Sequence, residues 1–122
     1  MGLAVAAAVI VLALTGCGNS IAQTATGLTG GSPDRGSAAI LRHGCGSCHQ
    51  IDGIARARGQ VGPSLNGLVN RMYIGGVLIN TPENLMTWIQ DPKAIDAKTA
   101  MPALGVTRKD AKDIAAYLYS IN

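Results

Sequence analysis

The motif at residues 42–51, RHGCGSCHQI, places Cys45 and Cys48 three positions apart and puts His49 directly after the second cysteine. A fold that contains this motif has to present all three side chains at one place. Three kinds of site use these atoms: a redox-active dithiol, part of a zinc site, and the covalent attachment point of a haem.

The spacing of the motif has a mechanical meaning for haem attachment. Two thiols on a tight turn can each form a thioether with one vinyl group, and the histidine that follows is then held under the iron. A zinc site would have to add His43, which crowds four ligands into one short segment, whereas zinc ligands usually come as two separated pairs. A thioredoxin-like dithiol belongs to a βαβ pattern that this sequence does not show. The motif therefore favours one covalent haem c over the two alternatives.

The N-terminal region predicts export. Residues 2–14 are all apolar or glycine, a run shorter than the roughly 20 residues that span a bilayer and typical of a secretory signal. The LTGC sequence that ends at Cys17 resembles the lipobox of bacterial lipoproteins, although no Lys or Arg precedes Arg35. We expect residues 1–16 to be a lipoprotein-like signal peptide or an uncleaved anchor, with lipidation at Cys17. This would hold the protein at a membrane on the bacterial periplasmic side.

The chain after this signal divides into a linker and a domain. Residues 17–32 are rich in Gly, Ser and Thr and carry no charge, so we expect a flexible tether. Residues 33–122 should form the folded domain. All ten basic and seven acidic residues follow the tether, and the basic excess between residues 34 and 71 suits docking to an acidic protein face. Nucleic acid is not an expected partner, because no basic run with interleaved aromatic residues is present.

Helix caps predict an all-α domain. Each of three expected helices follows a Ser or Thr that can accept hydrogen bonds from free N–H groups, and Pro stands first in two of them. Asp110 follows the last cap by three residues and approximates a capping box. Weaker signals indicate a short helix at residues 64–69 and a small hairpin at residues 73–80. The expected helices are 33–43, 82–90 and 108–122, after the caps Ser32, Thr81 and Thr107.

The opposite face of a haem held by His49 needs a second ligand. Met101 stands in the loop KTAMPALG between two helices, and a thioether from a loop can close that face and raise the reduction potential. We expect Met72 and Met86 to be core or surface residues. His43 is too close to the attachment site to reach the opposite face, so we expect it to be exposed or to support the ligands. Two protein ligands leave no position for a small-molecule substrate, which favours electron transfer over catalysis.

The segments CGSCH, GPSL and TAMP, with a helix before and a helix after, resemble class I c-type cytochromes over residues 33–122. The runs NTPENLMTWIQDP and AMPALGVT are similar to small domains fused to, or travelling with, haem-copper cytochrome c oxidases. The resemblance implies a cytochrome c fold in which N- and C-terminal helices pack crosswise around one haem. The family often has an aromatic residue in the first helix where this chain has Ile40 and Leu41, so we expect a weaker contact with Tyr117.

The resemblance also implies roles for individual residues. Cys45 and Cys48 would carry the thioether bonds, and His49 and Met101 would be the axial ligands. The carbonyl of Pro63 would accept a hydrogen bond from the ring of His49. Three further residues would line the pocket within reach of the haem propionates, although burial and surface charge explain them equally well: Arg71, Tyr73 and Trp88.

The function implied by the resemblance is that of a membrane-tethered electron carrier rather than an enzyme. It would receive one electron from a quinol-oxidising complex or a soluble donor and pass it to a cytochrome c oxidase or another redox protein of a respiratory chain. The first alternative is a haem enzyme or sensor with an open or labile sixth position. The second is a zinc module without haem.

Overall fold

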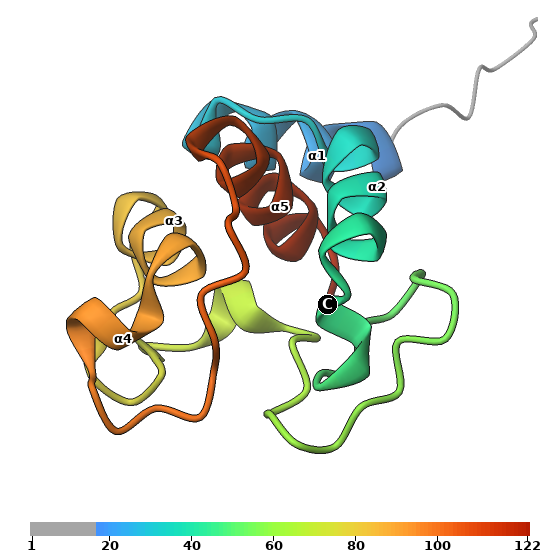
Figure 1. Cartoon of the computed structure of the whole chain (residues 1–122). Coiled ribbons are helices and arrows are strands. Elements are labelled where there is room, and N and C mark those ends of the chain that lie inside the picture. Colours follow the sequence, from blue (N-terminus) through green and yellow to red (C-terminus); the bar gives the residue numbers. More distant parts are fainter. Residues whose placement is uncertain (1–16) are drawn as a thin grey trace, which may run out of the picture.

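The structure, a computed structural model, describes residues 17–122, so the predicted signal peptide at residues 1–16 lies outside the described residues. About half of the described residues lie in helices, and the strands form only one short hairpin, in agreement with the predicted all-α class. Figure 1 shows α5 in the centre, with α2 on one side of it and α3 and α4 on the other. The elements are α1 (Cys17–Thr29), α2 (Pro33–His43), the 3-10 helices η1 (Cys45–Ser47) and η2 (Leu68–Asn70), strands β1 (Tyr73–Ile74) and β2 (Leu78–Ile79), α3 (Pro82–Gln90), α4 (Pro92–Ile95) and α5 (Arg108–Ser120).

Helix α2 begins and ends where the sequence predicts. The hydroxyl of Ser32 accepts a hydrogen bond from the N–H of Arg35, and Pro33 occupies the first helical position. Gly44 takes the left-handed conformation with φ 72°, which costs a glycine little and lets the chain turn sharply. The turn at Gly44 therefore leads directly from α2 into η1, where Cys45 lies.

Helices α3 and α5 also follow their predicted caps. The hydroxyl of Thr81 accepts a hydrogen bond from the N–H of Asn84, and that of Thr107 accepts one from the N–H of Asp110 at 3.1 Å. The capping box at Thr107 is only half formed, because the carboxylate of Asp110 turns to α2 instead. The carboxylate of Asp110 therefore connects α5 to α2 instead of completing the hydrogen bonds of the α5 cap.

The middle of the chain departs from the predictions in two places. The hairpin is confirmed, with Tyr73 opposite Ile79 in antiparallel register. The helix expected at residues 64–69 is wrong: Gly67 adopts φ 65°, which interrupts a right-handed helix, and only η2 follows it. Helix α4 was not predicted. The carboxylate of Asp91 accepts a hydrogen bond from the N–H of Ala94 at 3.1 Å, so the residues that end α3 also begin α4.

Helices α2 and α5 cross in close contact. A Cβ at Gly36 would overlap the backbone carbonyl oxygen of Asp113, so the absence of a side chain allows the two backbones to approach. Ile40 is fully buried and Leu41 is 55% exposed, so one of the two residues that stand in place of an aromatic faces the core. The hydroxyl of Tyr117 instead donates a hydrogen bond to the carbonyl of Asp52 at 2.7 Å. The packing of the terminal helices therefore does not depend on an aromatic pair.

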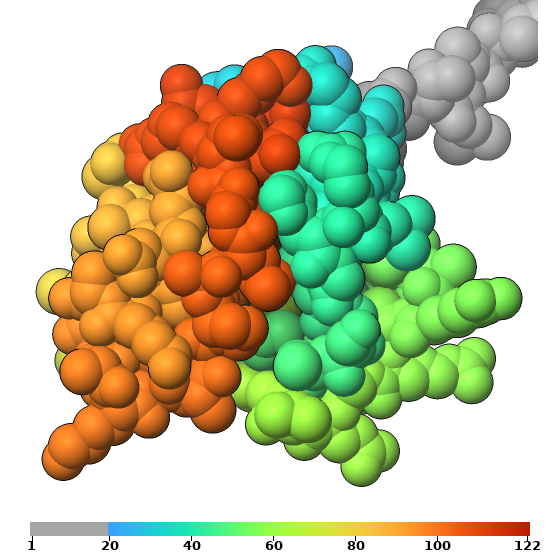
Figure 2. Space-filling model, in the orientation of Figure 1, coloured from blue at the N-terminus to red at the C-terminus, as the bar shows by residue number. Residues whose placement is uncertain are grey.

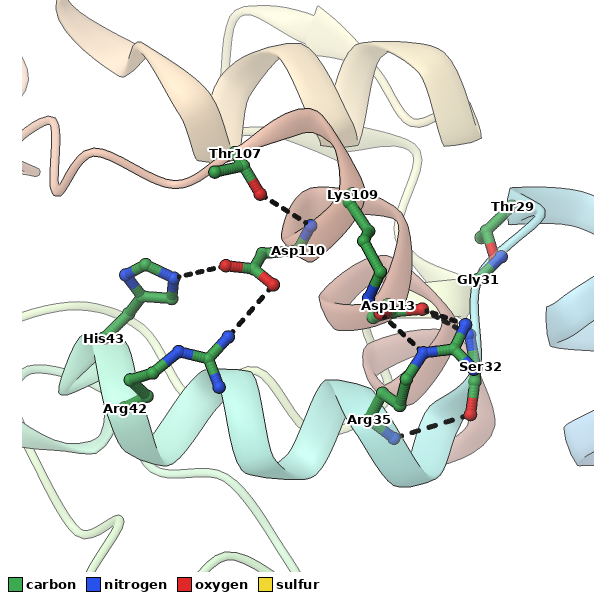
Figure 3. A network of polar contacts seen from close by, with 10 residues as sticks. All are labelled: Thr29, Gly31, Ser32, Arg35, Arg42, His43, Thr107, Lys109, Asp110 and Asp113. Atoms are coloured by element: carbon green, nitrogen blue, oxygen red, sulfur yellow. Dashed lines mark hydrogen bonds and ion pairs between the residues drawn. The ribbon is translucent and has the colours of Figure 1, made fainter.

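A buried carboxylate joins α5 to the start of α2 (Figure 3). Asp113 is 2% exposed and accepts two hydrogen bonds from the guanidinium of Arg35, at 2.9 and 2.8 Å. Burial alone would raise the pKa of Asp113, but the hydrogen bonds from Arg35, the backbone N–H of Ser32 and Lys109 outweigh burial and lower this pKa to about 2. The carboxylate is therefore charged in the folded protein at all ordinary pH values.

A second carboxylate joins α5 to the last turn of α2 (Figure 3). Asp110 lies 3.0 Å from Nε2 of His43 and 2.9 Å from Nη2 of Arg42. These two hydrogen bonds, that of His43 first, lower the pKa of Asp110. The side chain of His43 is only 14% exposed and serves the contact between helices. Of the two roles expected for it, exposure is therefore not found, and support of the ligands stays a prediction.

Residues 17–29 form helix α1, whereas their composition predicts a flexible tether. The helix packs against α5, with Ala25 and Thr29 only 2% and 4% exposed. Beyond it, a Cβ at Gly31 would overlap the backbone of Lys112. The prediction treated small residues as solvent-facing, but small residues also let two helices approach closely. The side chain of Cys17 is not described, so its lipidation stays a prediction.

The core lies where α2, α3 and α5 meet. Figure 2 shows the segment between α4 and α5, in orange to red, lying next to α2 and the region that follows it, in teal, on the face turned to the viewer. The loop between α4 and α5 (residues 96–107) thus lies side by side with α2 and η1 on this face of the molecule. Within residues 17–122 no helix combines the length and the apolar character needed to cross a membrane.

Candidate functional site

The core opens into a cavity of about 350 Å³, a size within the usual range for ligand sites. Its walls come from α2, η1 and the loop after it, η2, the hairpin, α3, the loop before α5, and α5 itself. Most of the wall is apolar, with Ile40, Ile51, Leu68, Leu85, Ile89, Ile114 and Leu118 among its residues. The cavity also brings together all eight residues expected to bind a cofactor: Cys45, Cys48, His49, Pro63, Arg71, Tyr73, Trp88 and Met101.

The two cysteines lie on a single tight turn. The N–H groups of Cys48 and His49 both donate to the carbonyl of Cys45, at 3.2 and 3.0 Å. Both thiols are free. Burial raises the pKa of the Cys45 thiol, whereas a reactive redox thiol needs a lowered pKa. The raised pKa therefore argues against Cys45 as a reactive redox thiol.

The ring of His49 is held in one tautomer. Its Nδ1 lies 2.6 Å from the carbonyl oxygen of Pro63. A carbonyl oxygen can only accept, so Nδ1 carries the proton and donates it. The lone pair of the neutral imidazole is then on Nε2, which is the atom able to ligate a metal. The hydrogen bond expected from the resemblance is thus present in the geometry.

Two glycines allow the loop after η1 to close over the motif. A Cβ at Gly62 would overlap the imidazole of His49, and the N–H of Gly62 donates to the carbonyl of Cys48 at 2.8 Å. A Cβ at Gly59 would overlap the backbone of Cys48. Sequence reasoning missed both residues, although the Gly-rich character of the loop was a usable signal.

Met101 lines the same cavity from the loop between α4 and α5. It is half-buried, and its backbone N–H donates to the hydroxyl of Thr99 at 3.2 Å. Met86 is 4% exposed inside α3 and Met72 is 76% exposed beside the hairpin. Neither of these two lines the cavity. Among the methionines of residues 17–122, only Met101 has its sulfur-bearing side chain in this wall.

The three residues expected near the haem propionates, Arg71, Tyr73 and Trp88, differ in their surroundings. Trp88 is 8% exposed and packs so closely on Gly75 that a Cβ there would lie 2.6 Å from the indole ring. Tyr73 is 55% exposed at the cavity rim. The guanidinium of Arg71 donates to the carbonyls of Ser64 and Asn66, so this side chain is tied to a loop. Their contact with propionates stays a prediction.

The donor set fits a haem and does not fit zinc. Within residues 17–122 no group of three or more His, Cys, Asp or Glu side chains is arranged to hold a metal ion. His43, the ligand a zinc site would need, is bonded to Asp110. Two thiols on one turn, an imidazole with Nε2 available and a thioether instead share an apolar cavity, which matches the requirements of covalent haem ligation.

Comparisons with known proteins agree with this geometry. The sequence profile of the family described as Cytochrome c matches residues 33–122. A cytochrome c oxidase subunit 2 from Alkalihalophilus pseudofirmus (strain ATCC BAA-2126 / JCM 17055 / OF4) is 32% identical over 89 residues, which make up 72% of this chain and 25% of that protein. The chain thus spans about a quarter of that relative's length. No solved structure gives a significant match.

Proposed function

The chain belongs to the cytochrome c family, and on this premise we propose that it carries single electrons to a terminal cytochrome c oxidase. The family indicates electron transfer and a covalent haem c. The observation that carries the proposal is the shared cavity of His49 and Met101, with the two cysteines on the same turn as the histidine.

The residues at this site have separate tasks. Cys45 and Cys48 would hold one haem by thioether bonds, and His49 and Met101 would ligate its iron. The bound haem supplies an iron that accepts and releases one electron. The carbonyl of Pro63 keeps Nε2 of His49 available, and this hydrogen bond raises the basicity of the imidazole as a ligand.

A pair of protein ligands, His49 and Met101, favours a carrier over an enzyme. If both residues ligated the haem iron, they would leave no position there for peroxide, a gas or another substrate. Ligation by methionine also raises the reduction potential, which suits a protein that gives electrons to an oxidase. The mostly apolar cavity walls would limit the access of water to a bound haem, which is one of the factors that set its potential.

Support for the acceptor comes from the relative and from surface charge. The relative that shares this domain is a cytochrome c oxidase subunit 2. Arg56 and Arg58 are exposed in the loop that leads to Val61 and Gly62 of the cavity wall. Positive charges at this place would steer the domain toward an acidic partner, and the attraction would weaken with added salt.

The proposed location is the periplasmic side of a bacterial membrane. The support is the sequence of residues 1–17, with an apolar run followed by a cysteine in a lipobox-like setting. After cleavage of the signal, a lipid on Cys17 would give a durable anchor if it carries more than one acyl chain.

The test is the spectrum of the protein purified from membranes. We expect a c-type α band in the reduced-minus-oxidised spectrum, and a haem that stays with the polypeptide after denaturation. The double variant Cys45→Ala, Cys48→Ala should lose the covalent haem. The matched variant Cys17→Ala should keep the haem and lose membrane association. A wild-type protein without the c-type band would overturn the proposal.

The acceptor is tested by stopped-flow mixing of the reduced protein with oxidase-containing membranes. Oxidation should be faster at low ionic strength, and Arg56→Glu with Arg58→Glu should slow it. Lys93→Glu on α4, outside that loop, makes the same charge change as either single variant, Arg56→Glu or Arg58→Glu, and should have a smaller effect than each of them. Oxidation that is insensitive to salt and to both arginines would contradict the proposed docking.

A further inference from the structure

The loop at residues 63–66 presents the carbonyl of Pro63 to His49, yet it contains no helix or strand. Pro63 itself is exposed. The position of its carbonyl therefore depends on bonds from other parts of the chain. The N–H of Leu65 donates to the carbonyl of Gln50 at 2.9 Å, and two further chains of hydrogen bonds reach this loop, both of which begin on α5.

The first chain approaches the loop through Arg71. One guanidinium nitrogen of Arg71 donates to the carbonyls of Ser64 and Asn66, at 2.5 and 3.0 Å. The backbone around Arg71 is fixed in turn by Asn80, whose amide nitrogen donates to the carbonyls of Leu68 and Arg71, at 2.8 and 2.9 Å. Asn80 thus holds the backbone of Arg71 while the side chain of Arg71 holds the loop.

Tyr119 is the origin of this first chain. Its hydroxyl donates to the amide oxygen of Asn80 at 2.6 Å, which fixes the amide with its nitrogen toward the two carbonyls. Tyr119 is 6% exposed, and burial raises its pKa to about 12. The hydroxyl therefore stays protonated and remains a donor over the whole ordinary pH range.

The second chain starts two residues earlier on α5. The hydroxyl of Tyr117 donates to the carbonyl of Asp52 at 2.7 Å. The N–H of Asp52 donates to the side-chain oxygen of Asn66 at 2.8 Å. The hydrogen bonds that start at Tyr117 thus reach the side chain of Asn66, and those that start at Tyr119 reach its backbone carbonyl. The two chains meet three residues after Pro63.

We propose that Tyr117 and Tyr119 are positioning residues for the loop at 63–66, and that they help set the reduction potential through the bond between Pro63 and His49. The inference rests on the proposed function, since the potential exists only in the haem-loaded protein. Neither tyrosine is near the motif in sequence, and their effect runs through named hydrogen bonds and through the covalent segments that join them, namely residue Arg71 and the backbone from Asn66 to Pro63.

The sign of the effect follows from the ligand. A short bond from Nδ1 of His49 to the Pro63 carbonyl makes the imidazole a stronger donor, which stabilises the oxidised iron. A loop that moves more freely lengthens this bond on average and weakens the donor. Loss of the tyrosine hydroxyls should therefore raise the potential.

The experiment compares Tyr117→Phe, Tyr119→Phe and the double variant as haem-loaded proteins. Each change removes one hydroxyl and keeps the ring, so folding should be retained. The double variant should shift the ratio of reduced to oxidised protein by about tenfold toward the reduced form at a fixed solution potential, which is about 59 mV for one electron. In the reduced state, NMR should show faster solvent exchange of the His49 ring N–H.

The matched control is Asp113→Asn, which keeps the side-chain shape and loses stability at the crossing of α2 and α5. It should leave the potential and the His49 exchange rate unchanged. An unchanged potential in the double tyrosine variant, or an equal shift in the control, would overturn the inference. A wild-type protein without a c-type spectrum would instead contradict the proposed function, so the two failures can be told apart.

Discussion

Gly36 of α2 lies against the backbone carbonyl of Asp113 on α5, so closely that a Cβ at residue 36 would overlap the carbonyl oxygen. A methyl group there must push apart two helices that form part of the cavity wall. We expect Gly36→Ala to lower the free energy of unfolding by about 1–3 kcal/mol, the usual cost of overpacking.

Denaturant unfolding of the haem-loaded protein measures this effect. Gly27→Ala is the matched control. Gly27 lies inside α1, and a Cβ added there would have no atom within 4 Å outside its chain neighbours and the adjoining backbone of the helix. That control should be neutral or stabilising by up to about 1 kcal/mol, since alanine favours helix over glycine. Equal losses in both variants would show that the close approach at Gly36 is not the cause.

Asp113 should make stability depend on acid pH. Its folded pKa of about 2 lies below the value of about 3.9 for a free carboxyl. The unfolded chain thus binds a proton first, so the stabilisation is complete above the unfolded pKa and is lost as the pH falls from about 4 toward 2. Asp113→Asn should cost about 2 kcal/mol at neutral pH and flatten this part of the stability curve. Unfolding titrations of both proteins between pH 2 and pH 7 check this, and parallel curves would contradict it.

Met101→Ala should lower the reduction potential and open the iron to added ligands such as carbon monoxide, because the thioether ligand is lost. Potentiometry and ligand-binding spectra measure the two effects. Met86→Leu, a buried change within α3, should leave both unchanged. If Met101→Ala resembles wild type in both respects, another residue is the second ligand.

Ala25→Asp should release α1 from α5. Ala25 is 2% exposed, and a carboxylate at this place would be buried without a partner. Limited proteolysis should then cut within residues 17–32, while residues 33–122 keep their haem spectrum. Gln23→Asp introduces the same charge at an exposed position of α1 and should stay protected. Rapid cleavage of the wild-type protein in this segment would instead support a flexible tether.

The helices of the domain were predictable because their signals are local. Ser32, Thr81 and Thr107 each cap their own helix, and Gly44 ends α2 at the motif. Helix α1 escaped prediction because its stability comes from α5, at the other end of the chain. The helix expected at residues 64–69 failed at Gly67, whose left-handed backbone the apolar pattern did not reveal.

The residues that would bind the haem were predictable, because covalent attachment requires the two cysteines and the histidine at a fixed spacing in the sequence. Cys45, Cys48 and His49 stand together in sequence, and Met-Pro in a loop marks a plausible ligand. The supporting residues could not be found in this way. Tyr119 and Asn80 act through carbonyls whose directions depend on the folded backbone. Arg71 lines the cavity as expected, but the bonds from one of its guanidinium nitrogens to Ser64 and Asn66 could not be read from the sequence.

The docking of α1 on α5 bears on how the protein would meet its partners. A lipid at Cys17 would connect to the domain through a packed helix instead of a flexible linker. The folded body would then stay within a short distance of the bilayer surface. Collisions with membrane partners would become a two-dimensional search among neighbours on the same face of the bilayer.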